Sequence, residues 1–551
     1  MKLNRSLLED IELADVVADR IIDPSIRGLY DPTRFVLRLR PDIHRRLKAL
    51  SAKGVIIEGG VDDDDLQAMS TYFHETIHWW QFMGSTSGLI MSLSFPSQIH
   101  SSLRYFKEYL KLTGHKKPIA IYNINNATEY KPKDREFMAI NHILNNFHDI
   151  YFYKVRTQTP EGFAECIKTP FFESLGHAFH ITYATTVSLL AIKLDEKFSF
   201  LPDINKWVKN FDELTDKKEP EFYYGSGIGL PSLGALALYE GQARFNQMLY
   251  LHIASNKTLD WDDFAEQYML EGLYIKAFDR FLNVIEEERP SSIDSPLVAL
   301  FLLLIDIAIN PTEGFPFDID NYKKFIHNTD PGIRFEKLCH IIKTKHPEFK
   351  GYITDYSSEQ YWYVSNALCN SLGIHSPQQL SKKVSEWCES QESIIDLLKQ
   401  DESFDYEDSN IVISIIFARF LRYQSDKLTH PDYFCWPGLF MNGERLSPTI
   451  TELYIKHQPL FKENDDLNVS AALLPGISEE VLMNTSGHFY SVLSVYELCR
   501  QWIFEPGEFN YNFHWLTYEY SREEMELWVK NNFKNVFGVM PENFELVTPK
   551  A

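Results

Sequence analysis

Residues 62–84 have the sequence DDDDLQAMSTYFHETIHWWQFMG, and their pattern predicts a single buried helix. The acidic run at its start suits the positive end of a helix dipole, and Gly84 suits the residue just after a helix. Apolar residues recur every three or four positions: Leu66, Met69, Phe73, Ile77 and Trp80. A second stripe with this spacing is polar: Gln67, Ser70, His74, His78 and Gln81. A helix this apolar belongs in the interior, where its polar side chains need partners.

The segment His74-Glu75-Thr76-Ile77-His78 has a definite chemical meaning on a helix. Side chains four positions apart lie on one face, so both imidazoles can reach one Zn²⁺. Glu75 is then placed to take a proton from a zinc-activated water. The alternative is a pair of core histidines bonded to backbone carbonyls. The buried helical setting and the polar stripe favour the metal site.

A catalytic zinc normally needs three protein ligands, and no third histidine follows His78 closely. The best candidate is Glu240, in the segment LYEGQAR at 238–244. A helix near 231–252, with Pro231 in its first turn, would place Glu240 on an apolar face, where a carboxylate must be neutral, paired or metal-bound. Small residues in the segment, Gly241 among them, would let this helix approach another closely. The alternative partner is Arg244, and the next candidate ligands are Glu108, His177 and His180.

Together, the two segments resemble the gluzincin division of the zincin metallopeptidases. In that division the third ligand is often a glutamate in a Glu-Gly-x-Ala context, which here starts at Glu240. The resemblance implies a zinc-dependent peptidase in which His74, His78 and Glu240 bind Zn²⁺ and Glu75 is the general base. Arg244 stands where thermolysin-like enzymes carry a carboxylate that supports a ligand histidine. An arginine cannot accept that hydrogen bond, so the supporting acceptor must come from elsewhere.

Two other classes of protein could contain this motif. Glu75-x-x-His78 is half of a di-iron carboxylate site, but no other histidine in the sequence has a glutamate three residues before it. The second class is a non-enzymatic helical scaffold or interaction protein with a structural or vestigial metal site. Metal content separates a zinc enzyme from a scaffold with chance histidines.

The composition of the chain limits which partners it could bind and where in the cell it could lie. The net charge of −23 argues against nucleic acid or an anionic membrane surface as the main partner. The resemblance to gluzincins implies a peptide or protein substrate instead. The six cysteines are scattered without a Cys-x-x-Cys pair, which favours reduced thiols. The N-terminus has no apolar signal region, and the longest apolar run, 297–305, is too short to span a bilayer. We therefore expect a cytoplasmic protein, and the sequence gives no indication of its oligomeric state.

The whole chain predicts a mainly α fold with a small N-terminal β component, an α+β arrangement. A zincin-like core of packed helices, expected from the resemblance, is followed by a large helical C-terminal region. We predict three parts: an α+β segment at 1–60 with strands near 35–40 and 55–57, a catalytic core at 61–285, and a helical domain at 295–551. A charged, Pro/Ser-rich stretch at 286–292 separates the last two. Further helices are expected near 86–93, 97–113, 133–154 and 171–194, and a capping box is expected at Ser521 and Glu524.

Overall fold

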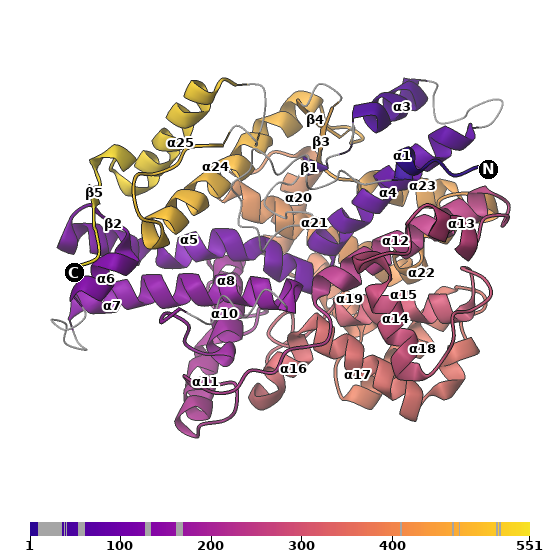
Figure 1. The fold of residues 1–551 in the computed structure, drawn as a ribbon, viewed down its shortest axis with the longest axis horizontal. Coiled ribbons are helices and arrows are strands. Elements are labelled where there is room, and N and C mark those ends of the chain that lie inside the picture. Colours follow the sequence, from indigo (N-terminus) through magenta and orange to yellow (C-terminus); the bar gives the residue numbers. More distant parts are fainter. Residues whose placement is uncertain are drawn as a thin grey trace.

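The computed structural model describes residues 1–8, 36–37, 39, 41–52, 61–126, 134–160, 169–407, 410–464, 468–472, 474–513, 516 and 520–550. The structure is 69% helix and 3% strand, which confirms the prediction of a mainly α fold with a small β component. Figure 1 shows how the helices are arranged. Most of their buried hydrophobic side chains form one large continuous cluster.

The first half of the chain contributes the elements that hold the candidate site. In chain order its helices and strands are α1 (Arg5–Leu8), β1 (Val36–Leu37), α3 (Pro41–Ala52), α4 (Asp63–Gly84), α5 (Thr86–Thr113), β2 (Lys116–Lys117), α6 (Ile119–Asn126), α7 (Arg135–Asn141), the π-helical turn η2 (His142–Asn146), α8 (Phe147–Gln158), α10 (Leu175–Leu194), η4 (Ile204–Lys206), α11 (Trp207–Asp216), α12 (Ala235–Ala254), α13 (Trp261–Glu266) and α14 (Leu273–Ile285).

The second half packs against the first and closes the core. Its helices and strands are α15 (Pro296–Ala308), η5 (Tyr322–Lys324), α16 (Phe325–Thr329), α17 (Pro331–Thr344), η6 (Pro347–Gly351), α18 (Ser358–Leu372), α19 (Pro377–Ser390), α20 (Glu392–Ser403), α21 (Ile411–Thr429), α22 (Pro431–Cys435), η7 (Pro437–Leu439), η8 (Gly443–Arg445), α23 (Pro448–Lys456), β3 (Phe461–Glu463), β4 (Val469–Ala471), α24 (Glu479–Phe504), α25 (Arg522–Phe537), η9 (Pro541–Asn543) and β5 (Glu545–Leu546).

Several helix boundaries differ from the predicted ones. The helices expected at 86–93 and 97–113 are one helix, α5, with Pro96 inside it. Burial of most of its N-terminal half outweighs the hydrogen bond that this proline removes. The helix expected at 133–154 is α7, η2 and α8 in succession. The predicted 231–252 helix begins at Ala235 with Gly234 as its N-cap, so Pro231 lies in the preceding loop and not in the first turn. The predicted capping box at Ser521 and Glu524 is confirmed.

The small strands join distant parts of the chain. Strand β1 pairs in parallel with β3, which pairs antiparallel with β4, and β2 pairs in parallel with β5. The strand predicted near 35–40 is therefore present as β1, but its described partner comes from the C-terminal region. The strand predicted near 55–57 lies outside the described residues. The division into 1–60, 61–285 and 295–551 stays a prediction, and contacts such as β1 with β3 cross its boundaries.

Helix α4 begins as its sequence predicts and ends differently. Asp62 is the N-cap, and its side chain accepts a hydrogen bond of 2.7 Å from the backbone N–H of Asp65. Arg46 of α3 pairs with Asp64 at 2.9 Å and so ties this end to its neighbour. Gly84 is not the residue after the helix but its last residue. A Cβ atom there would lie 2.5 Å from the ring of Tyr423, so the glycine is explained by close packing against α21.

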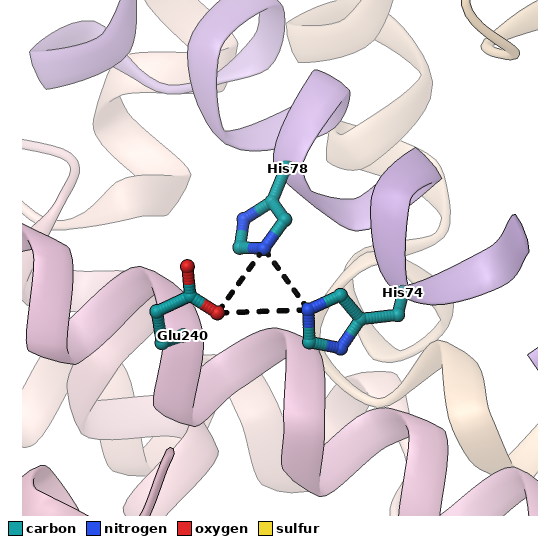
Figure 2. Close-up of side chains that lie close together, drawn as sticks. All are labelled: His74, His78 and Glu240. Carbon is teal, nitrogen blue, oxygen red and sulfur yellow. Dashed lines mark hydrogen bonds and ion pairs between the residues drawn. The ribbon is translucent and has the colours of Figure 1, made fainter. Parts of the chain in front are cut away.

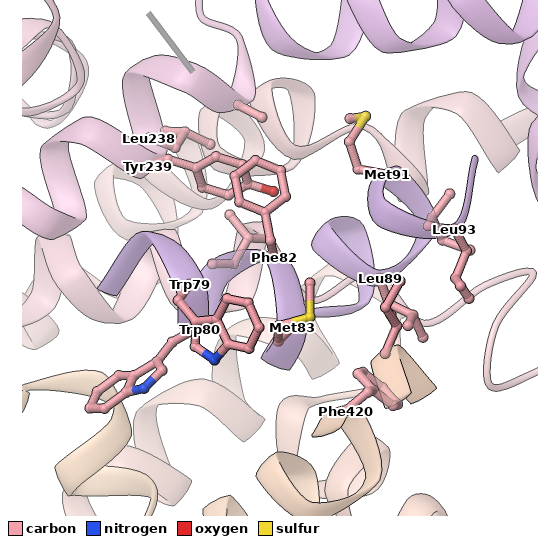
Figure 3. Packing of buried hydrophobic residues seen from close by; sticks show 14 of the residues in the cluster. Trp79, Trp80, Phe82, Met83, Leu89, Met91, Leu93, Leu238, Tyr239 and Phe420 are labelled. Atoms are coloured by element: carbon pink, nitrogen blue, oxygen red, sulfur yellow. The ribbon is translucent and has the colours of Figure 1, made fainter. Parts of the chain in front are cut away.

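The apolar face of α4 packs against aromatic side chains from the second half of the chain. The ring of Trp80 lies 5.6 Å from that of Phe434 and 6.4 Å from that of Tyr454, and Phe73 also contacts Tyr454. The indole N–H of Trp80 donates a 2.8 Å hydrogen bond to the backbone oxygen of His457. Figure 3 shows the dense packing around the C-terminal end of α4. Residues from α21 to just beyond α23 thus cover the helix that carries the motif.

Among the described helices, α10 alone has the length and apolar composition that crossing a membrane requires. Most of it is buried inside the structure, where it packs against α5 and α8. A core helix of a globular protein can have the same length and composition, so these two properties alone do not identify α10 as a membrane span.

Helices α4 and α5 approach each other very closely at their junction. The side chain of Ser85 caps α5 by accepting a hydrogen bond of 2.9 Å from the backbone N–H of Gly88. A Cβ atom at Gly88 would lie 1.9 Å from the backbone oxygen of Gln81 and 2.6 Å from the Cα of Phe82. Only a residue without a side chain fits between two backbones at this distance.

We expect Gly88→Ala to lower the free energy of unfolding by about 1–3 kcal/mol, because the new methyl group must displace the backbone of α4. Denaturant unfolding followed by circular dichroism measures this change. Gly487→Ala in α24 is the matched control. Its Cβ would meet no atom within 4 Å, so it should be neutral or stabilise by about 0.5–1 kcal/mol. Equal stability of the two variants would contradict the close approach.

Candidate metal centre

Three potential metal ligands meet between α4 and α12. Figure 2 shows His74 and His78 from α4 and Glu240 from α12 pointing toward a common point. The Nε2 atoms of the two histidines are 3.1 Å apart. The Oε2 atom of Glu240 lies 3.6 Å from Nε2 of His74 and 3.4 Å from Nε2 of His78. The structure therefore brings together the three side chains that the sequence suggested as ligands.

The spacing of these donor atoms fits a zinc ion. Ligands at the corners of a tetrahedron, each about 2.1 Å from zinc, are separated from one another by about 3.4 Å. The three separations, 3.1, 3.4 and 3.6 Å, are close to that value. Two imidazoles and one carboxylate also match the ligand set of a catalytic zinc site, in which the fourth position belongs to water or substrate. Among the described residues, this is the one group of three or more such side chains close enough to hold a metal ion.

The electrostatics of the group favour a cation at its centre. Burial alone lowers the pKa of His78, but the Glu240 carboxylate outweighs this effect, and with Glu75 and Gln81 it raises that pKa to about 9. Burial raises the pKa of Glu240, but His78 and His74 outweigh it and hold this pKa well below its usual range. The carboxylate therefore stays ionised in a setting where its side chain is only 12% exposed. A positive charge, either a proton or a metal ion, is what this arrangement stabilises.

From Ser70 to Gln81 the polar stripe of α4 faces α12, whereas Gln67, at the start of the stripe, bonds the backbone of the N-terminal segment. Gln247 of α12 donates hydrogen bonds to the hydroxyls of Ser70 at 3.2 Å and Thr71 at 3.4 Å. The two histidines follow opposite Glu240, and Gln81 meets the backbone of Tyr239. Positions that rise along α4 thus meet positions that fall along α12, so the helices are antiparallel. The stripe predicted from sequence is the polar half of a buried helix–helix interface.

The neighbours of Glu240 differ from those considered for the sequence alone. Arg244 donates a 2.5 Å hydrogen bond to the side chain of Gln247, and its guanidinium lies 3.9 Å from the ring centre of Tyr274. The recorded ion pairs of Glu240 are instead with the two histidines. A Cβ atom at Gly241 would face Phe301 of α15, so this glycine does not explain the approach of α12 to α4.

The other candidate ligands are engaged away from this centre. Glu108 binds Arg135 at 2.8 Å. Nδ1 of His177 lies 2.6 Å from the carboxylate of Asp149. His180 stacks on the ring of Phe211, and burial lowers its pKa to about 3.

Sequence reasoning missed one aromatic residue at the site. Tyr274, near the start of α14, lies with its ring centre 6.2 Å from that of His74 and nearly perpendicular to it. No motif marks this tyrosine in the sequence, because its contact with the site depends on how α14 packs against α12. The polar residues Gln242 and Gln247 were also missed. They could have been found because they lie on a helix that is buried along nearly its whole length, where a polar side chain needs a partner.

Zinc binding should release a proton and strengthen as the pH rises. In the metal-free protein, His78 is protonated below pH 9 because its pKa is about 9, whereas a zinc ligand must have a bare nitrogen. Between pH 7 and pH 9 the affinity should therefore rise about tenfold per pH unit. Calorimetry in buffers of different ionisation enthalpy counts the protons released.

Glu240→Gln provides the comparison for this measurement. Without the carboxylate, the pKa of His78 returns toward its ordinary value, so the variant should bind zinc more weakly and release much less than one proton at pH 8. Proton release that is unchanged in this variant would show that Glu240 does not set the charge of the site.

Comparison of the chain with protein-family models, with curated proteins and with solved structures finds no match. The resemblance to gluzincins is confined to the two short segments that contain His74 to His78 and Glu240. In the folded chain these segments meet at distances that suit a metal ion.

Proposed function

We propose that this protein is a zinc-dependent peptidase of gluzincin-like type, with a peptide or protein as its substrate and the cytoplasm as its location. The observation that carries the proposal is the meeting of His74, His78 and Glu240 at tetrahedral spacing, with Glu75 next to the first histidine on the same helix. Zinc held there would supply a Lewis acid, which makes a nearby water acidic and polarises a carbonyl group.

Glu75 has the properties that a general base at this centre needs. It is less buried than His74 and His78, and it lies close enough to the centre for its charge to raise the pKa of His78. Its carboxylate would take a proton from the attacking water and deliver it to the leaving amine of the peptide. The rigid, buried helix α4 fixes this carboxylate relative to the two ligands on the same helix.

Tyr274 of α14 also supports the proposal. Its ring contacts the ring of His74 edge-on, the Arg244 guanidinium lies over it, and it belongs to α14, which packs against α12. A phenol beside the reacting carbonyl would donate a hydrogen bond to the oxygen that gains negative charge during attack. The guanidinium that lies over the tyrosine ring adds positive charge next to the phenol.

The purified protein should contain about one zinc per chain, and Glu75→Gln should keep this zinc while losing hydrolysis. The amide has nearly the same shape but cannot accept the proton, so turnover should fall by about 10²–10⁴-fold. Elemental analysis and mass spectrometry of a digested peptide library measure the two properties.

His74→Ala is the control, because it removes a ligand and should empty the site. Full zinc content in that variant would contradict the metal assignment. Wild-type turnover in Glu75→Gln would show that Glu75 is not the general base. A protein that binds one zinc and cleaves no peptide would support the non-enzymatic scaffold with a structural metal site.

Tyr274→Phe should lower kcat by about 10–1000-fold with little change in KM or zinc content, since it removes a single donor that acts during the reaction. Steady-state kinetics on the best peptide from the library provide the measurement. Tyr268→Phe, an exposed tyrosine in the segment before α14, is the matched control and should keep wild-type kinetics. If both variants behave like wild type, the donor must be sought in another residue.

A further inference from the structure

We infer that Gln81 is a positioning residue for the metal centre, because it fixes the imidazole of His78 with Nε2 toward the metal position. This inference rests on the proposed zinc site and does not depend on peptidase activity. It answers a question that the sequence raised, since Arg244 cannot supply the acceptor that supports a ligand histidine.

The contacts of Gln81 determine the orientation of its amide group. Its Nε2 lies 2.9 Å from the backbone oxygen of Tyr239 and 2.9 Å from Oε1 of Gln242. A backbone carbonyl can only accept a hydrogen bond, so the NH₂ end of the Gln81 amide must face Tyr239. The oxygen of the same amide must then face His78, where Oε1 lies 2.8 Å from Nδ1.

This orientation determines which nitrogen of His78 carries a hydrogen. The amide oxygen of Gln81 can only accept, so Nδ1 of His78 must be the donor. In the neutral ring the other nitrogen, Nε2, then has a free electron pair. That nitrogen lies 3.1 Å from Nε2 of His74 and 3.4 Å from Oε2 of Glu240. Gln81 therefore selects the form of His78 that can bind a metal at the shared point.

The same amide also links the two helices that supply the ligands. Gln81 lies on α4, three residues after His78, whereas both of its acceptors lie on α12 and flank Glu240 in sequence. All of these side chains are buried, apart from the partly exposed Glu240, so the hydrogen bonds are shielded from water. A shift of α12 relative to α4 would break them and move the carboxylate away from the histidines.

The test compares zinc affinity in matched variants of the full chain. Zinc dissociation constants are measured by competition with a chromophoric chelator, and stability is measured by denaturant unfolding of the metal-free protein. Gln81→Met removes both functions of the amide and should weaken zinc binding by about 10–100-fold. Gln98→Met is the control. Gln98 is equally buried and bonds to Phe147 and Lys154 away from the site, so its loss should lower stability and leave zinc affinity unchanged.

Two further variants separate orientation of the ring from general stability. Gln81→Glu keeps an acceptor for Nδ1 of His78 but loses the donor to Tyr239, so it should unfold more easily while binding zinc more tightly than Gln81→Met does. Gln242→Met removes one of the two acceptors that hold Gln81 and should weaken zinc binding by less than Gln81→Met. This variant also tests the inference if Gln81→Met does not fold.

The inference is overturned if Gln81→Met binds zinc as tightly as wild type, or loses no more affinity than Gln98→Met. It is also overturned if affinity follows stability across all four variants. Because the readout is metal affinity, a protein that binds zinc without cleaving peptides would still support the role of Gln81 and would refute only the peptidase.

Discussion

The buried polar contact between α4 and α12 is the constraint on which the rest of the structure depends. Ser70 meets Gln247, the two histidines meet Glu240, and Gln81 meets the backbone of Tyr239. Each polar group left without a partner in such an interior costs about 1–3 kcal/mol. Sliding one helix by a single turn, about 5.4 Å, would break every one of these contacts at once. The interface therefore fixes the helix register, and the register fixes the ligand geometry.

The adjacent apolar face of α4 is held by contacts of another kind. There, Phe73 and Trp80 need shape and apolar area, which aromatic residues from α21 to α23 provide. These partners differ from polar ones in that they tolerate small shifts, because dispersion and burial are not directional. The helix is thus aligned by its polar side and anchored by its apolar side. This division suits a metal centre, which needs accurate placement of few atoms within a large, stable core.

Local pattern was enough to predict α4, its acidic start, its two stripes and the three side chains, His74, His78 and Glu240, that meet between α4 and α12. The histidines are four residues apart, and Glu240 stands out as a carboxylate on the apolar face of its helix. Local pattern was not enough where a residue type is determined by a contact with a part of the chain that is distant in sequence. Position 84 is a glycine because the Tyr423 ring leaves no room for a Cβ atom, and Tyr274 contacts His74 through the packing of α14. The residues next to them in sequence indicate neither contact. The strand partner of β1 could not be predicted for the same reason.

The hydrogen bond from Trp80 to His457 spans 377 positions of sequence, and this separation affects the order of events during synthesis. At about 5–20 residues per second, roughly 20–75 s pass between the emergence of these two residues from the ribosome. Glu240 emerges well within that interval, so all three proposed ligands are present before the aromatic partners of Trp80 in the second half of the chain have been synthesised. A zinc ion at the proposed site would therefore find all three proposed ligands before the second half of the chain closes the core. During the same interval Trp80 lacks these aromatic partners, which cover it in the folded protein, and apolar surface exposed in this way promotes aggregation.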